Sequence, residues 1–155
     1  MKANIETLKN QLWNRMMDDV ANDHEQFIAL LYHLTANEGQ QDWEDVDAMI
    51  GEDYLVLTDE EADEKAYEYI ADNVWAFKPS FLSSYTGIDE EVFKVLQENR
   101  NEDANAPITS MIEDFDEFVG DAVRTDGRGH FLASYDFNEY EVTVNDTTYY
   151  IYRVN

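Results

Sequence analysis

The stretch LTDEEADEKAYEYIADNVWAFKPSFL, from Leu57 to Leu82, carries the clearest helix signal in the chain. Thr58 and Glu61 have the spacing of a capping box, in which each side chain accepts a hydrogen bond from the other residue's backbone N–H, so we expect a helix to begin at about Asp59. Pro79 should end it, because proline has no amide hydrogen and disfavours helical geometry at the preceding residue. Apolar residues return at steps of three and four, which predicts one core-facing side: Ala62, Ala66, Tyr69, Ile70, Val74 and Phe77.

The opposite side of this predicted helix carries a row of carboxylates. Its members follow the same steps, and Trp75 continues the row: Glu61, Glu64, Glu68 and Asp72. At ~1.5 Å of rise per residue, the row spans roughly 16 Å. One DNA strand would place about five phosphates over that length, since its phosphates lie about 3.4 Å apart along the axis. The charge densities are comparable, which favours a surface that imitates DNA.

Composition bounds the class of protein. The chain has 155 residues, of which 44% are hydrophobic and 14% aromatic, and this is typical of one folded domain rather than a disordered chain. Lys and Arg number 10 against 35 Asp and Glu, for a net charge of −25. Such a surface repels nucleic acid and anionic lipid and attracts basic proteins. There is no cysteine and no apolar run of the ~20 residues that a membrane span needs, so we expect a cytoplasmic protein.

Negative charge is concentrated in one part of the chain. Residues 18–72 hold eighteen acidic residues and one base, whereas the rest holds seventeen acids and nine bases. Further acids therefore support the predicted partner-binding row: Asp42, Glu44, Asp45, Asp47, Glu52 and Asp53. Neighbouring aromatic residues could anchor such an interface, although such residues more often belong to the core or its boundary: Trp43, Tyr54, Tyr67 and Trp75. The alternative reading of the acids is a solvated face or adaptation to high salt.

Four more helices are expected from apolar spacing. They lie at about 4–20, at about 22–34 with Asn22 and Glu25 as a capping box, at about 43–50, and over 88–96, where Ile88, Val92, Val95 and Leu96 mark the apolar face. Residues 54–57 fit either a short strand or an extended connection, and Phe81 to Tyr85 a turn. After the polar linker NRNEDANAP, a further helix should bury the apolar residues between Ile108 and Val119.

The last thirty or so residues change period. Runs rich in aromatic and β-branched residues predict strands at 130–135, 140–144 and 148–154, with a tight hairpin at 144–147. The sequence therefore predicts a single α+β domain, helical over about 4–124 and followed by a C-terminal antiparallel β-meander over about 129–154.

A second candidate site lies in TDGRGHFLASYD, from Thr125 to Asp136. Asp126, Arg128, His130 and Asp136 would place carboxylates, an anion binder and a possible general base in one loop and strand. As an active site this would indicate a small enzyme of unknown reaction. No nucleophile elbow, phosphate loop or metal signature surrounds it, so a structural turn in which Arg128 and His130 pair with local carboxylates is the preferred reading.

Neither a metal nor a cofactor is expected. The aspartates around Gly51 do not fit the twelve-residue calcium loop, and His24 and His33 are nine residues apart, which is not the spacing of a ligand pair on adjacent helical turns.

Several segments together resemble a group of small acidic proteins of phages, plasmids and bacterial mobile elements. They are YLVLTDEEADEKAYEYIADNVWAF, FLSSYTGID, DGRGHFLASYD and the closing YYIYRVN. The resemblance covers about the last two-thirds of the chain and implies a mobile-element setting, although it carries no activity or residue role. That setting favours interference with host restriction enzymes, CRISPR effectors or other nucleases.

The sequence thus predicts an acidic DNA mimic that binds the nucleic-acid-binding surface of a host defence or DNA-processing protein. It would act in the bacterial cytoplasm as a monomer or homodimer, without binding nucleic acid or a membrane itself. The alternatives are the small enzyme above and a regulatory interaction module whose acidity serves only solubility.

Overall fold

A computed structural model describes residues 25–155 and has an α+β fold, as expected. The predicted helix at 4–20, Asn22 and His24 lie outside the described residues. The chain divides into two compact units, each described here by itself. We call residues 25–63 with Arg128–Asn155 the sheet unit, and Glu64–Gly127 the helical unit. The single domain expected from the sequence stays a prediction, because two compact units can still fold cooperatively.

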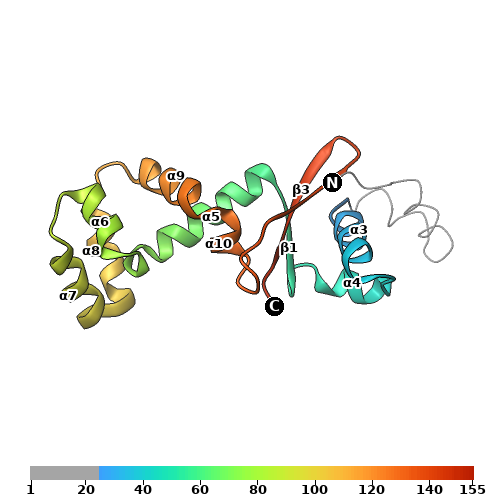
Figure 1. Cartoon of the computed structure of the whole chain (residues 1–155), viewed down its shortest axis with the longest axis horizontal. Coiled ribbons are helices and arrows are strands. Elements are labelled where there is room, and N and C mark those ends of the chain that lie inside the picture. Colours follow the sequence, from blue (N-terminus) through green and yellow to red (C-terminus); the bar gives the residue numbers. More distant parts are fainter. Residues whose placement is uncertain (1–24) are drawn as a thin grey trace. The chain divides into compact units, whose positions relative to one another are not determined.

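The sheet unit is built on three antiparallel strands in the order β1-β3-β2 (Figure 1). Strands β2 (Tyr140–Val144) and β3 (Thr147–Arg153) form the predicted hairpin, whose turn residue Asn145 has a φ of 55°. Strand β1 (Tyr54–Thr58) pairs with β3 from the far side, with Val56 opposite Ile151. Residues 54–57, left open between strand and connection, therefore form a strand.

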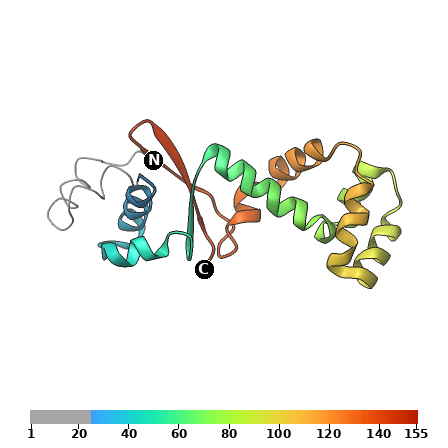
Figure 2. The ribbon, with the colours of Figure 1, turned by 180° about the vertical axis from the view of Figure 1, so that it is seen from behind.

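Helices α3 (Glu25–Glu38) and α4 (Trp43–Met49) lie on one side of this sheet, and α10 (Arg128–Leu132) lies on the other (Figures 1 and 2). Both α3 and α4 were predicted. The α3 run from Phe27 to Leu34 is almost entirely buried, because it packs on the apolar face of the sheet. Trp43 and Tyr54 belong to the same core, so they are core residues rather than the interface anchors considered above.

Two boundaries of the predicted β-region are wrong. Residues 130–135 form no strand, since His130 to Leu132 belong to α10 and a turn follows. The third strand is instead β1, which interrupts the region expected to be helical over about 4–124. The sheet is therefore not a purely C-terminal meander, and its middle strand β3 joins segments far apart in the sequence.

Helix α5 (Asp59–Asp72) begins where the capping box predicts but ends earlier than expected. A 3-10 turn, η1 (Val74–Ala76), follows it, and Pro79 then occupies the first turn of α6 (Pro79–Thr86). Proline suits that position, where its missing N–H has no helical partner to lose. The aromatic turn expected at 81–85 is thus part of a helix, and Tyr69, expected on the core side of α5, is exposed.

The rest of the helical unit consists of α7 (Glu90–Arg100), η2 (Asn101–Ala104), α8 (Asn105–Ser110) and α9 (Phe115–Asp126). In α7 the buried residue is Phe93, whereas Val92 and Val95 are exposed and were placed on the wrong face. The helix predicted over 108–119 is split in two, because Asp114 accepts a hydrogen bond from the Glu117 N–H and caps a new helix.

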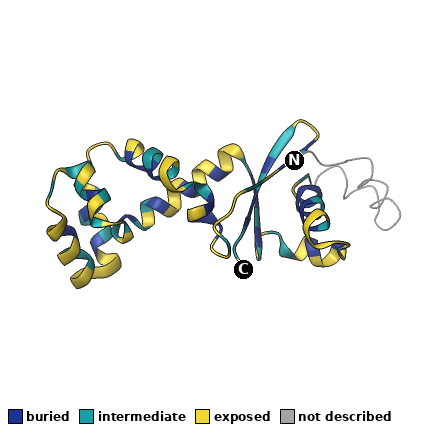
Figure 3. Cartoon of the chain, in the orientation of Figure 1, coloured by how far each residue is buried: buried dark blue, intermediate teal, exposed yellow. Residues whose placement is uncertain are grey.

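The core of the helical unit is largely aromatic. Phe118 is fully buried, and its ring centroid lies 5.1 to 5.8 Å from those of four other rings, which are Phe77, Phe81, Tyr85 and Phe115. Buried and exposed residues alternate along α5 (Figure 3). Ala66 and Ile70 are fully buried, so the helical repeat places Glu64 and Glu68 on the outward side.

Candidate partner-binding surface

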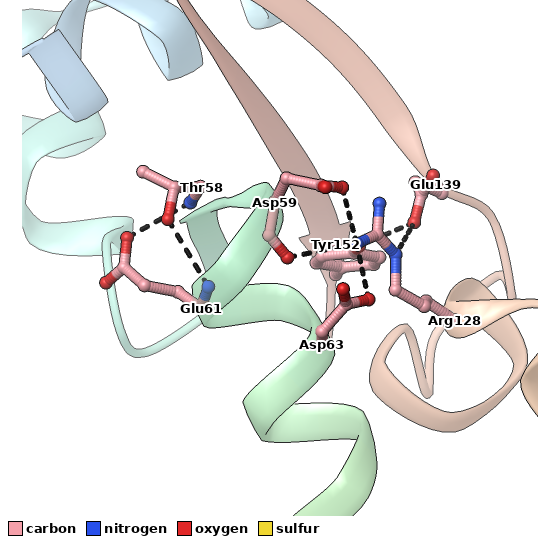
Figure 4. Close-up of polar contacts among 7 residues, drawn as sticks. All are labelled: Thr58, Asp59, Glu61, Asp63, Arg128, Glu139 and Tyr152. Atoms are coloured by element: carbon pink, nitrogen blue, oxygen red, sulfur yellow. Dashed lines mark hydrogen bonds and ion pairs between the residues drawn. The ribbon is translucent and has the colours of Figure 1, made fainter. Parts of the chain in front are cut away.

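The first turn of α5 is held by the predicted capping box. The Glu61 N–H donates to Thr58 Oγ1 at 3.3 Å, and the Thr58 N–H donates to Glu61 Oε1 at 3.0 Å (Figure 4). These bonds satisfy two backbone donors that the start of a helix leaves without partners. Glu61, the first member of the predicted row, therefore stabilises the helix itself.

The next three members of the row are exposed, as predicted from their spacing. Glu64, Glu68 and Asp72 form no hydrogen bond or ion pair within residues 25–155. Lys65 is the one base of α5, and it too forms no ion pair with another described residue. We call Glu64, Glu68 and Asp72 the open row.

Trp75 does not continue this row. It lies in η1 and is half-buried, and its backbone N–H donates to Asn105 Oδ1 at 3.1 Å. Asn105 Nδ2 in turn donates to the Ala71 carbonyl at 2.8 Å, which ties α8 to the end of α5. Because α5 ends at Asp72, Trp75 no longer follows the helical repeat that aligns the carboxylates.

The supporting acids lie in the sheet unit. Asp42 caps α4 by accepting a hydrogen bond from the Glu44 N–H at 3.0 Å. The others expose their carboxylates on α4 and the turn after it, apart from the half-buried Asp53: Glu44, Asp45, Asp47, Glu52 and Asp53. No group of three or more His, Asp or Glu side chains in the described part of the chain is arranged to hold a metal ion.

The glycine-rich segment has a different role from the one expected, because Arg128 binds acids distant in sequence. Its Nη1 lies 2.8 Å from Asp59 Oδ1 and 3.0 Å from Asp63 Oδ1, and its Nε lies 2.9 Å from Glu139 Oε2 (Figure 4). Its guanidinium also lies 4.5 Å from the centre of the Tyr150 ring. Arg128 thus joins the start of α5, α10 and the segment leading into β2.

The electrostatics of this Arg128 cluster follow from burial. The Arg128 side chain is only 10% exposed, which disfavours its charge, but hydrogen bonds to Glu139 and Asp59 outweigh that and leave its pKa above the ordinary value. The Tyr152 hydroxyl donates to the same Glu139 oxygen at 2.6 Å. Burial is the main cause that raises the pKa of Tyr152, and the hydrogen bond to Glu139 raises it further. The Tyr152 hydroxyl therefore remains a neutral donor.

The other residues of the second candidate site bind elsewhere. Asp136 accepts hydrogen bonds from the Asn138 N–H at 3.1 Å and from the Tyr140 hydroxyl at 3.3 Å. His130 is exposed, and its ring centroid lies 5.8 Å from that of Phe137. Asp126 is exposed at the end of α9, in the helical unit. The expected pairing of Arg128 with Asp126 or Asp136 is replaced by pairing with Asp59, Asp63 and Glu139.

No pattern in the sequence identified Asp59 and Asp63 as ligands of Arg128, or assigned a role to Glu139 and Tyr152. The signal available was indirect: Arg128 stands between two glycines in a chain with few bases. Nothing in local spacing identifies partners 65 and 69 residues away.

Comparison of the chain with protein-family models, with characterised proteins and with solved structures found no match. Among the described helices, none combines the length and the apolar character required to cross a bilayer.

Proposed function

We propose that this protein binds a basic, nucleic-acid-binding host protein through the open row and blocks access of DNA or RNA to it. The observation that carries the proposal is the set of exposed carboxylates at Glu64, Glu68 and Asp72, which have no cationic partner among the described residues. Carboxylates at this spacing resemble the charge of one DNA strand. The resemblance of several segments to small acidic proteins of mobile elements favours a restriction enzyme, a CRISPR effector or another nuclease as the target.

The open row lowers the stability of its own helix. Glu64 and Glu68 are four residues apart, as are Glu68 and Asp72, and like charges at that spacing each cost about 0.2–0.5 kcal/mol. Since packing and capping of α5 within residues 25–155 do not require these carboxylates, a contact with a partner accounts for them better than folding of that part of the chain does. A basic groove would be attracted from a distance, with an association rate that falls as salt rises.

The test is a competition assay against a panel of bacterial restriction enzymes and RNA-guided nucleases, read as displacement of labelled duplex DNA. The triple variant Glu64→Lys, Glu68→Lys, Asp72→Lys should lose displacement of whichever nuclease the native protein inhibits. We leave Glu61 unchanged because its side chain caps α5. The matched control reverses three other exposed acids of the helical unit, Glu98, Glu102 and Asp103, and changes the net charge equally.

The control variant should keep most of the displacement activity. If both triple variants lose it equally, total charge rather than the open row is responsible. If no nuclease of the panel is displaced by the native protein, the proposal is wrong for this class of target. Lys65→Glu should strengthen binding at low salt, since it removes the one base of α5.

A further inference from the structure

The loop between α10 and β2 holds two aromatic side chains in solvent. We call residues 133–139 the aromatic loop. Tyr135 is 58% exposed and Phe137 is 60% exposed, more than any other large hydrophobic residue of the described chain. Large aromatic rings gain more than most side chains from burial, so a fixed pair of exposed rings is typical of a binding surface.

The surrounding backbone holds Phe137 in a strained conformation. Its φ is 60°, in the left-handed region, and the only other described non-glycine residues with positive φ are Asn101 and Asn145. Asparagine tolerates this region, whereas a bulky aromatic residue there is an outlier. The Phe137 N–H donates to the Ala133 carbonyl at 2.7 Å, and a Cβ on Gly129 would lie 2.7 Å from the Phe137 carbonyl oxygen. The surrounding backbone therefore maintains the strain.

Each exposed ring is also backed by a neighbour. The Arg153 guanidinium lies 3.7 Å from the centre of the Tyr135 ring, and the Tyr135 N–H donates to the Arg153 carbonyl at 3.1 Å. Phe137 has the His130 ring beside it, at 5.8 Å between centroids. Each ring is thus held by its own neighbour, and little side-chain freedom remains to be lost when a partner binds.

Carboxylates lie on the Tyr135 side of the aromatic loop. Asp136 lies between the two aromatic residues in sequence, and Arg153, which stacks on Tyr135, also lies 5.8 Å from the centre of the Tyr54 ring. Burial raises the pKa of Tyr54 and Arg153 lowers it, while the charges of Glu38, Asp136 and Asp53 each raise it, so these three carboxylates surround the Tyr54 ring that shares Arg153 with Tyr135. An apolar centre with an acidic border is complementary to a surface that is apolar and basic.

We propose that the aromatic loop is a docking site for a protein segment that carries arginine beside leucine or similar apolar side chains. The apolar side chains would cover Tyr135 and Phe137, and the arginines would meet the bordering carboxylates. This inference goes beyond the proposed function and uses none of the open row. Single-stranded nucleic acid could also stack on such rings, but the net charge of −25 opposes its phosphates.

The test measures binding of the full chain to two synthetic helical peptides by fluorescence anisotropy. One peptide carries leucines along one face with arginines immediately beside them, and the other has every leucine replaced by glutamine, at the same charge. The native protein should bind the leucine peptide about tenfold more tightly, as expected for a pair of aromatic anchors. Phe137→Gly and Tyr135→Ala should each remove most of that preference without changing net charge.

Phe137→Gly separates binding from folding, because glycine adopts positive φ without strain. We expect its thermal midpoint to stay level or rise while the preference for the leucine peptide falls. The matched control, Val92→Ala with Val95→Ala, removes two exposed apolar side chains from α7 and should keep the preference.

The proposal is overturned if the native protein binds both peptides equally, if Phe137→Gly keeps the preference, or if an oligothymidine competes for the loop more tightly than the leucine peptide. A lower thermal midpoint of Phe137→Gly would also overturn it, since the ring would then belong to the fold. The open-row triple variant should bind both peptides more weakly but keep the ratio between them, so failure here is distinguishable from failure of the proposed function.

Discussion

Helix α5 carries two groups of carboxylates that the structure treats in opposite ways. Asp59 and Asp63, in the sheet unit, share the buried guanidinium of Arg128. Glu64, Glu68 and Asp72, in the helical unit, meet no base within the described residues. The same residue types therefore stabilise the fold in one group and weaken the helix in the other, so the carboxylates of α5 occupy two different structural settings. Substitutions at four positions can break or sharpen this comparison.

The largest effect should come from Arg128→Met. It leaves Asp59, Asp63 and Glu139 gathered without a cation, and breaking a buried pair costs about 3–5 kcal/mol. Because Asp59 and Asp63 remain largely exposed, we expect about 2–4 kcal/mol, measured as the change in free energy of urea unfolding. Arg124→Met is the control: Arg124 pairs with Asp121 at the surface, and its loss should cost at most about 1 kcal/mol.

Gly129→Ala should separate geometry from charge. The new Cβ would press on the backbone of Phe137 and Asn138, which cannot yield as the end of a flexible side chain can, and would push Glu139 away from Arg128. We expect a loss of about 1–3 kcal/mol in the free energy of unfolding. Gly120→Ala, within α9 and near only the end of the Arg124 side chain, should be neutral or stabilising by up to about 1 kcal/mol.

Glu61 lies between Asp59 and Asp63 in sequence, and two substitutions test whether its carboxylate stabilises the fold. Glu61→Ala removes the acceptor of the Thr58 N–H and should cost about 1 kcal/mol, whereas Glu61→Gln keeps an acceptor and should cost less. Thermal unfolding of both variants tests this. An equal loss for both would mean that the charge of Glu61, rather than its hydrogen bond, matters.

Glu68→Gln should have the smallest effect and the opposite sign. It removes the like-charge repulsion of Glu68 with Glu64 and with Asp72, so we expect a gain of about 0.5 kcal/mol at low salt that shrinks as salt screens the charges. A loss of stability would show that Glu68 has a partner within the fold and would remove it from the open row.

Local signals predicted much of the fold. Apolar spacing located α3 and α4, the Thr58–Glu61 capping box located the start of α5, and an Asn-Asp turn located the β2–β3 hairpin. The segment 130–135 was misread because its aromatic residues favour strands in isolation, while tertiary packing holds His130 to Leu132 in a helix. Val92 and Val95 were placed on the buried face of α7, although Phe93, one position from Val92, is the residue that is buried there.

The candidate site divides in the same manner. The exposure of Glu64, Glu68 and Asp72 follows from spacing alone, since Ala66 and Ile70 fix the buried side of the helix. The ligands of Arg128 cannot be predicted from spacing, because contacts across 65 and 69 residues depend on how β1 and β3 pair. The exposure of the Phe137 ring could not be predicted from the sequence either, since the backbone angle of Phe137 is imposed by the segment around Gly129.

The pairing of β1 with β3 has a consequence for biosynthesis. Strand β1 leaves the ribosome roughly ninety residues before its partner, which at about 5–20 residues per second is a delay of several seconds or more. During that interval its backbone edge has no native neighbour, so the nascent chain is open to aggregation or chaperone capture until β3 has been synthesised. A stop codon anywhere before Thr147 would leave that edge permanently without its partner.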